Sequence, residues 1–196
     1  LKAGDRISYV NYEKSVIFAV IGKKPLDEGC RIIASHIDNP RLDLKPQPLY
    51  ENSGIAYFKT HYYGGIKKYQ WPTIALALHG VVCRKDGTSV TITIGEDEND
   101  PILMISDLLP HLAADQMQKT AAKVITAEQL NVILGTEPIE GDGADLVKLN
   151  VMKFLNEKYG LIEEDFLSAE LTIVPAGRCR EVGFDRSLIS AYGHDD

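Results

Sequence analysis

Two short apolar runs near the start of the chain most constrain its fold. They span residues 15–21 (SVIFAVI) and 30–35 (CRIIAS), and a Lys-Lys-Pro turn region at residues 23–25 lies between them. Near-continuous apolar runs of this length are typical of strands that are buried on both faces, as in the sheet of an α/β domain. The sequence therefore predicts that the chain begins in an α/β core.

The pattern changes after about residue 46. An Asp-Gly pair at residues 86–87 lies between the β-rich run 73–82 and the alternating run 90–94, which is a good hairpin signal. Apolar periodicity predicts the remaining elements, which are helices over residues 102–119 and 145–159 and strands over residues 131–134 and 169–174. These elements describe an α+β module set between two pieces of an α/β domain, with boundaries near residues 46 and 185.

The charge and the cysteine content of the chain limit its possible binding partners and its cellular compartment. The 196 residues have a formal net charge of -7, so nucleic acid and anionic membranes would repel the chain. The apolar stretches are too short to span a bilayer. The three cysteines form no C-x-x-C pair, which indicates neither a disulfide framework nor a thiolate zinc site. We therefore expect a cytoplasmic protein that binds neither nucleic acid nor membranes.

The two ends of the sequence resemble internal positions. The chain opens on Leu1 without an initiator methionine and stops at Asp196 without a polar tail. We expect both ends to be cuts through a longer protein.

The sharpest local feature is the segment SHIDNP at residues 35–40. In an extended chain His36 and Asp38 point to the same side. A neutral imidazole is a good zinc ligand through one nitrogen, and a nearby carboxylate can hold its other N–H. Taken alone, however, the pair is better explained as a surface histidine hydrogen-bonded to a carboxylate near a turn.

The chain ends on a second candidate segment, YGHDD at residues 192–196. Asp195 and Asp196 could bridge two divalent metals, because one carboxylate has two oxygens to share. A solvated acidic end explains the same residues, and in isolation that interpretation is favoured.

The other histidines are explained structurally from the sequence. His111 lies within the predicted helix 102–119, beside its apolar face, and His61 and His79 lie in strand-like runs. The sequence contains no Gly-x-Ser-x-Gly elbow, no Rossmann glycine fingerprint and no His-Glu-x-x-His zinc helix. Nothing in it indicates a nucleophile triad.

Four segments, in this order, resemble those of the M18 metalloaminopeptidases, whose best-known members are the aspartyl aminopeptidases. They are ASHIDNPRL (residues 34–42), HYYGG (61–65) with Trp71 and an apolar run after it, LLPHLA (108–113), and FDRSLI (184–189) running into the terminal HDD. Each segment is modest alone, but together they span nearly all of the chain.

This resemblance implies a fold, which is a partial α/β zinc-peptidase catalytic domain with an inserted β-rich α+β dimerisation domain. Residues 1–45 would be the first part of the catalytic domain, residues 46–185 the inserted domain, and residues 186–196 the return into the catalytic domain.

The resemblance also implies roles for individual residues. His36 would be a ligand of one metal, and Asp38 would orient it. Asp195 would bridge both metals, with Asp196 following across a cis peptide bond. His111 would reach a neighbouring subunit's active site and bind substrate there, so that the protein would self-associate as a dimer or a larger homo-oligomer. The implied cofactor is Zn²⁺, two ions per complete active site, although other divalent metals could serve.

The implied activity is metal-assisted removal of N-terminal residues from peptides, acidic ones in the aspartyl branch. In the family the general-base glutamate and the later metal ligands lie beyond the position of Asp196, so this chain alone is expected to be inactive. Two other interpretations stay open: a non-catalytic oligomerisation module of such a peptidase, and an unrelated α+β domain with a chance His-x-Asp.

Overall fold

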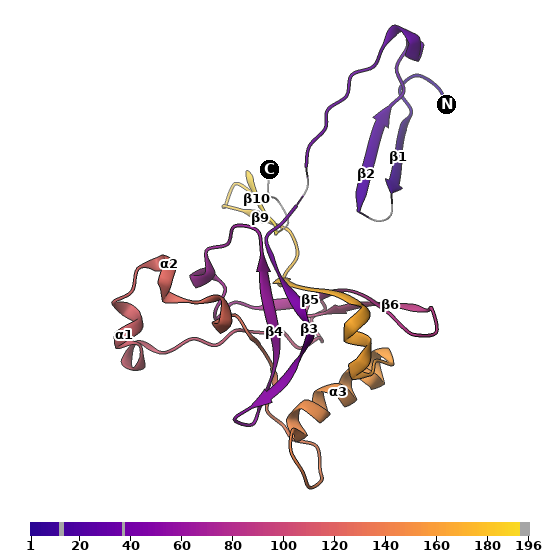
Figure 1. Ribbon diagram of the computed structural model, residues 1–196. Helices are drawn as coiled ribbons and strands as arrows, with labels where there is room; N and C mark the ends of the chain where they lie inside the picture. Colours follow the sequence, from indigo (N-terminus) through magenta and orange to yellow (C-terminus); the bar gives the residue numbers. More distant parts are fainter. Residues whose placement is uncertain (12–13, 37, 193–196) are drawn as a thin grey trace. The chain divides into compact units, whose positions relative to one another are not determined.

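The computed structural model describes residues 1–11, 14–36 and 38–192 (Figure 1). The chain forms two compact units, residues 1–36 and residues 37–196. Each unit forms its own sheet structure. The predicted boundary at residue 45 lies within a strand of the second unit, and the domain boundaries of the complete protein stay predictions.

The first unit is an antiparallel hairpin of β1 (Arg6–Asn11) and β2 (Ser15–Val20), in register from Arg6↔Val20 to Asn11↔Ser15. β2 confirms the strand predicted at residues 15–21. Most side chains of the hairpin are exposed.

The strand predicted at residues 30–35 is wrong. These residues form no regular element and are exposed, with Ile32 at 81% and Ile33 at 97% of their maximal accessible surface. A strand needs neighbours for its N–H and C=O groups, and among the described residues no strand pairs with this segment. Its apolar side chains are therefore not buried within this chain.

The second unit is built on a six-stranded sheet with the order β6-β5-β8-β3-β4-β7, in which the described pairings are antiparallel. Its strands are β3 (Arg41–Asn52), β4 (Ile55–Tyr63), β5 (Leu76–Cys83), β6 (Ser89–Ile94), β7 (Val132–Gly135) and β8 (Ala169–Pro175). A separate small sheet pairs β9 (Arg180–Val182) with β10 (Leu188–Ser190). The strands predicted over 73–82, 90–94, 131–134 and 169–174 are confirmed.

The predicted hairpin joins β5 to β6. Its register runs from Leu78↔Ile94 to Cys83↔Ser89, and Gly87 turns the chain with a φ of 83°. The Asp86 carboxylate accepts hydrogen bonds from the N–H and the hydroxyl of Thr88, at 2.9 and 2.6 Å. The Asp-Gly pair therefore forms the turn because Gly87 adopts a left-handed conformation and the Asp86 side chain accepts hydrogen bonds within the turn.

The strand β8 is inserted between β3 and β5, although it lies far from both in the sequence. Ile173 pairs with Leu42 of β3 on one side and with Leu78 of β5 on the other. Gly80 of β5 allows the close approach, because a Cβ built there would lie 1.9 Å from the carbonyl oxygen of Glu170. Since β3 and β8 are antiparallel, the start of β3 lies beside the end of β8. The residues that precede β3 and those that follow β8 thus leave the sheet at the same end.

The core lies between the sheet and the helix α3 (Leu146–Tyr159), which crosses one face of it (Figure 1). Phe58 of β4 is 1% exposed and packs edge-on against Phe166, with ring centroids 5.6 Å apart. Leu155 of α3 is 3% exposed. Burying apolar side chains of this size contributes roughly 1.5–3 kcal/mol each.

The continuous helix predicted over residues 102–119 is wrong, and only short helical turns form in it, at Pro110–Leu112 and Ala114–Met117. Its first part is extended, and Leu103 exchanges two backbone hydrogen bonds of 2.9 Å with Leu76 of β5. Leu103 and Ile105 are buried, whereas Met104 between them is 39% exposed, so the buried side chains alternate as in a strand. The apolar residues of this segment fit both the helical and the strand period, and hydrogen bonding to the start of β5 decides between them.

Short helices connect the remaining elements. They are η1 (Leu26–Glu28), η2 (Lys68–Gln70), η3 (Pro110–Leu112), α1 (Ala114–Met117), α2 (Ala121–Val124), η4 (Ala127–Gln129) and η5 (Glu163–Ser168). Within the part of the chain that the structure describes, no helix is long and apolar enough to cross a membrane.

The helix α3 confirms the prediction over residues 145–159, and its start is capped from the sheet. No side chain of its own N-cap residue, Asp145, bonds the first turn. Instead, the Glu51 carboxylate of β3 accepts hydrogen bonds from the N–H groups of Val147 and Lys148, at 2.9 and 3.0 Å. A carboxylate there satisfies two orphan donors and complements the helix dipole.

Replacing Glu51 by alanine should loosen α3. The substitution leaves two N–H groups without their acceptor, which costs about 1–2 kcal/mol. Hydrogen exchange followed by mass spectrometry on the complete protein should show faster exchange across residues 146–150. Glu157→Ala, which removes an exposed carboxylate from the same helix, is the control and should leave exchange there unchanged. Equal protection in Glu51→Ala and the parent protein would contradict this capping role.

Candidate functional site

The residues predicted to form a site fall in different parts of the structure. His36 is exposed at the end of the first unit, and Asp38 and His111 belong to the second. Asp195 and Asp196 lie outside the described residues, and so does the cis peptide bond predicted between them. The proximity of His36 and Asp195 therefore stays a prediction.

The Asp38 carboxylate is held by several donors just before β3. It accepts a hydrogen bond of 2.7 Å from the Tyr63 hydroxyl and one of 2.8 Å from the N–H of Asn39. The Arg41 guanidinium lies 3.5 Å from the same carboxylate and donates to Asp43 at 2.8 Å. It also stacks over the Tyr63 ring, 4.0 Å from the centroid. This arrangement fixes both the position and the orientation of a negatively charged group.

Tyr63 reaches this network because it ends β4, where the register pairs it with Arg41 of β3. Its hydrogen bond to Asp38, together with the charge of that carboxylate, raises the pKa of the Tyr63 phenol above its ordinary value. The sequence placed Tyr63 within the HYYGG motif but gave it no role. The signal that marks it is its position at the end of a strand, directly before the Gly64-Gly65 turn.

A second contact joins this segment to the end of the chain. The Tyr192 hydroxyl donates to the carbonyl of Pro40. The Tyr192 ring also packs edge-on against Trp71, with centroids 6.3 Å apart and an interplanar angle of 89°. Burial raises the pKa of Tyr192 to about 12, against an opposing effect of Arg41. The residues that follow Asp38 and those that precede Asp195 are thus brought together at the sheet end where β3 starts and β8 stops.

His111 belongs to a different part of the second unit. It lies in η3 with an exposed side chain, and large apolar side chains around it are also exposed. They are Leu108 (55%), Leu109 (67%), Leu112 (73%) and Met117 (72%). We call these four residues the His111 apolar cluster. An exposed apolar cluster of this kind is typical of an interaction surface.

His79 is held by a carboxylate and is not part of a metal cluster among the described residues. Its Nε2 lies 2.9 Å from Glu96, whose other oxygen accepts the N–H of Gly177 at 3.2 Å. This agrees with the structural role that the sequence indicated. The pair links the β5–β6 hairpin to the residues that follow β8.

The donor set of the predicted site suits zinc but is incomplete. Across residues 1–11, 14–36 and 38–192 no group of three His, Cys, Asp or Glu side chains could hold a metal. An imidazole and a carboxylate are ligands that zinc accepts, and zinc usually takes at least three from a protein. His36 and Asp195 would therefore form part of a ligand set.

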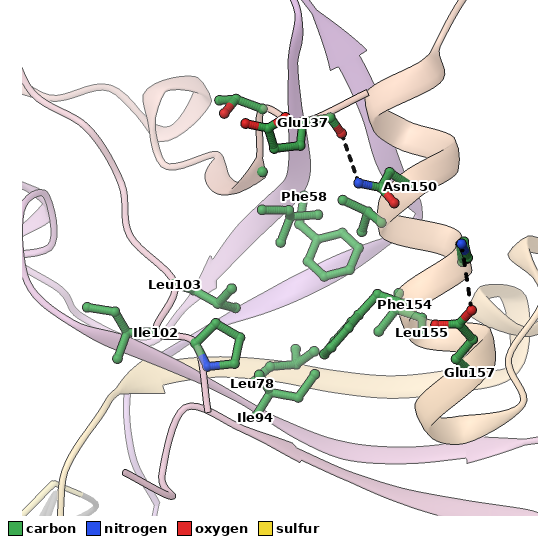
Figure 2. Close-up of a pocket in the computed structure, with 16 residues that line it drawn as sticks. Phe58, Leu78, Ile94, Ile102, Leu103, Glu137, Asn150, Phe154, Leu155 and Glu157 are labelled. Atoms are coloured by element: carbon green, nitrogen blue, oxygen red, sulfur yellow. Dashed lines mark hydrogen bonds and ion pairs between the residues drawn. The ribbon is translucent and has the colours of Figure 1, made fainter. Parts of the chain in front are cut away.

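A cavity of about 420 Å³ lies away from these residues, between α3 and the sheet (Figure 2). Apolar side chains such as Phe58, Leu78 and Leu155 line it. At its rim the Asn150 amide donates to the carbonyl of Glu137 at 3.0 Å. None of the predicted site residues lines the cavity, so it is not part of the predicted metal site.

Comparison with known proteins relates these features to a family. The family model described as "Aminopeptidase I zinc metalloprotease (M18)" matches residues 1–196. A curated relative from Clostridium acetobutylicum, named probable M18 family aminopeptidase 1, is 55% identical over the whole of this chain and 42% of its own length. The Borreliella burgdorferi relative of the same name is 49% identical over the whole of this chain and 43% of its own.

Solved structures show the same likeness. The crystal structure of the M18-family aminopeptidase from Thermotoga maritima matches 99% of this chain and 42% of that one, with 48% identity and a TM-score of 0.87. Aminopeptidase I from Clostridium acetobutylicum matches 98% of this chain and 42% of that one, with 51% identity and a TM-score of 0.86. These matches confirm the predicted fold class of a partial zinc-peptidase fold with a β-rich domain. The chain spans less than half the length of these proteins.

Replacing Asp38 by asparagine should lower the pKa of Tyr63 toward the ordinary tyrosine value. The amide carries no negative charge, so it no longer opposes formation of the phenolate. The measurement is a pH titration of labelled tyrosine Cζ signals by NMR. Tyr50, whose pKa is raised by burial and by Tyr57, is an internal control that should not move. An unchanged Tyr63 titration would show that Asp38 does not set its pKa.

Proposed function

Because the chain belongs to the M18 family of zinc metalloproteases along its whole length, we propose that it supplies the first part of a zinc aminopeptidase active site. The observation that carries this proposal is the contact between Tyr192 and Pro40, which joins the segments bearing two of the proposed site residues. In an unrelated domain, the segment just after Asp38 would have no reason to contact the residue that leads to a pair of aspartates.

In the proposed site His36 would bind a zinc ion through an imidazole nitrogen, and Asp38 would hold its other N–H. This contact fixes the tautomer and raises the basicity of the ligand. The donors on Asp38 keep its carboxylate in place for that task. Asp195 would be a ligand of both ions. When bound, the ions lower the pKa of a water molecule and polarise the scissile carbonyl of a peptide.

We propose that this chain alone does not hydrolyse peptides. It provides two proposed metal ligands, and a catalytic zinc site usually takes three protein ligands and an open position. The chain spans 42% of the Clostridium acetobutylicum relative, so the complete protein has room for the general base and the remaining ligands.

We propose that any preference for an acidic N-terminal residue depends on a cation outside the Asp38 network. An acidic side chain of a substrate would need a basic partner. Arg41 is the cation of this network, and its guanidinium already pairs with Asp38 and Asp43. An acidic preference would therefore depend on a basic group elsewhere in the complete enzyme.

His111 is proposed to bind substrate in the active site of a neighbouring subunit. Its side chain and the His111 apolar cluster are exposed on this chain, so docking on a second copy would bury the cluster and carry the imidazole with it. The oligomer and its peptide substrates belong to the complete protein.

His36→Ala in the complete enzyme should release zinc and abolish turnover. Loss of a first ligand should weaken zinc binding by roughly 100-fold or more, since even outer partners of a ligand contribute 10- to 100-fold. Zinc content and peptide hydrolysis are the measurements. The control is His79→Gln, which keeps a hydrogen bond to Glu96 and should retain both. Undiminished zinc and turnover in His36→Ala would refute the ligand role and favour the non-catalytic oligomerisation module.

His111→Ala should lower turnover without loss of bound zinc, because the imidazole is proposed to contact substrate rather than metal. Mixed oligomers provide the sharper test. A subunit with His111→Ala keeps its ligands, and a partner with His36→Ala can lend it His111, so mixing two weak variants should restore activity. If mixing restores nothing while zinc stays bound, His111 does not act across the interface.

A further inference from the structure

We propose that the cavity between α3 and the sheet is a binding site for a small, uncharged apolar molecule. The residues that line it include neither His36 nor Asp38, so this site is separate from the proposed function. Its volume of about 420 Å³ falls within the range of small-molecule sites, which is about 300–1,000 Å³. Since an apolar cavity of about 150 Å³ can bind benzene, this one has room for a molecule of roughly two or three rings.

Apolar side chains of the sheet and of α3 form the deep part of the cavity (Figure 2). Phe58 and Leu78 line it from the sheet and Leu155 lines it from the helix, and these side chains are 1, 2 and 3% exposed. A water molecule in a cavity needs about two to four polar partners. Side chains of this kind supply none, so an apolar molecule suits the space better than ordered water does.

Polar contacts at both ends of α3 keep this space open. At the start of the helix, the Glu51 carboxylate accepts hydrogen bonds from two N–H groups of the first turn. At its end, the Arg84 guanidinium donates to the carbonyl of Tyr159, whose hydroxyl donates to the carbonyl of Thr93 in β6 at 2.8 Å. The middle of the helix cannot move toward the sheet and close the cavity without breaking these bonds. The site is therefore formed before a ligand binds, as is usual for small-molecule sites.

The mouth of the cavity limits the charge of the ligand. Ile102 and Phe154 line the cavity and are 58 and 41% exposed, so it opens to solvent beside them. Two further lining residues, Lys153 and Glu157, lie 3.9 Å apart and offset each other's charge, whereas the exposed Glu137 adds a negative charge. An anion would be repelled here, and any charged group would lose its hydration in the apolar interior. The structure therefore favours an uncharged ligand.

Gly135 of β7 offers a direct way to fill the cavity. It lines the cavity, and the nearest atom to a Cβ built there belongs to Val151 of α3, at an ordinary contact distance of 3.8 Å. In Gly135→Leu the new side chain would extend into the empty space without a clash at its Cβ. The substitution therefore competes directly with a bound ligand.

The test measures binding of the uncharged fluorophore N-phenylnaphthylamine, whose emission rises in apolar surroundings, to the complete protein. We expect saturable binding to a single site per subunit, weakened roughly tenfold or more in Gly135→Leu. The probe should also raise the unfolding midpoint of the parent protein more than that of this variant. The control is Leu149→Ala, on the same helix, because Leu149 is 48% exposed and lies outside the cavity lining. It should bind the probe as the parent does. Val151→Phe fills the cavity from the helix side and should repeat the loss of binding if Gly135→Leu fails to fold.

Three outcomes would overturn the proposal. Absence of saturable binding to the complete protein would show that another part of the chain or a second copy occupies the cavity. Unchanged affinity in the variants that fill the cavity would place the probe on a different surface, such as the His111 apolar cluster. Equal or tighter binding of the anionic probe anilinonaphthalenesulfonate at this site would contradict the assignment of an uncharged ligand.

Discussion

Insertion of β8 between β3 and β5 is the constraint on which the rest of the second unit depends. It pairs Ile173 with both Leu42 and Leu78, and it requires the close approach that Gly80 permits. Because β3 and β8 run in opposite directions, the residues before β3 and the residues after β8 emerge together. The contact between Pro40 and Tyr192, 152 positions apart in the sequence, is a consequence of this one strand order. Asp38 of the proposed metal site therefore lies near a sheet end where backbone pairing has already closed the long loop.

The polar groups at this sheet end stabilise one another through hydrogen bonds and an ion pair. Asp38 accepts from Tyr63 and from the N–H of Asn39, and Arg41 balances part of its charge. A network of this kind orients a carboxylate, which is what an outer partner of a zinc-binding histidine has to provide. In the same network Arg41 already pairs with Asp38 and Asp43. It therefore helps to orient the Asp38 carboxylate, and recognition of a charged substrate is left to another group.

The parts of the fold that could be predicted from the sequence are those determined by interactions between residues close together in the chain. The β5–β6 hairpin follows from Asp86 and Gly87, and α3 follows from its apolar spacing, since both signals act within a few residues. The strand predicted at residues 30–35 and the helix predicted over residues 102–119 are wrong because their apolar patterns are compatible with more than one partner. The hydrogen bonds of Leu103 come from β5, and no local signal reveals them. The contacts of Tyr63 and Tyr192 are hidden from the sequence for the same reason, since Tyr63 meets Asp38 only after β4 has paired with β3, and Tyr192 meets Pro40 only after β8 has joined the sheet.

Several large apolar side chains are exposed on this chain. Ile32 and Ile33 in the first unit and the His111 apolar cluster in the second are uncovered within this chain. Burying such side chains contributes free energy only when a partner surface is supplied, either by later parts of the same chain or by a second copy. If His111 completes a neighbour's site, the energy that assembles the oligomer also places a substrate-binding imidazole. Assembly and catalysis would then depend on the same buried surface, and a subunit that folds alone would remain without a complete site.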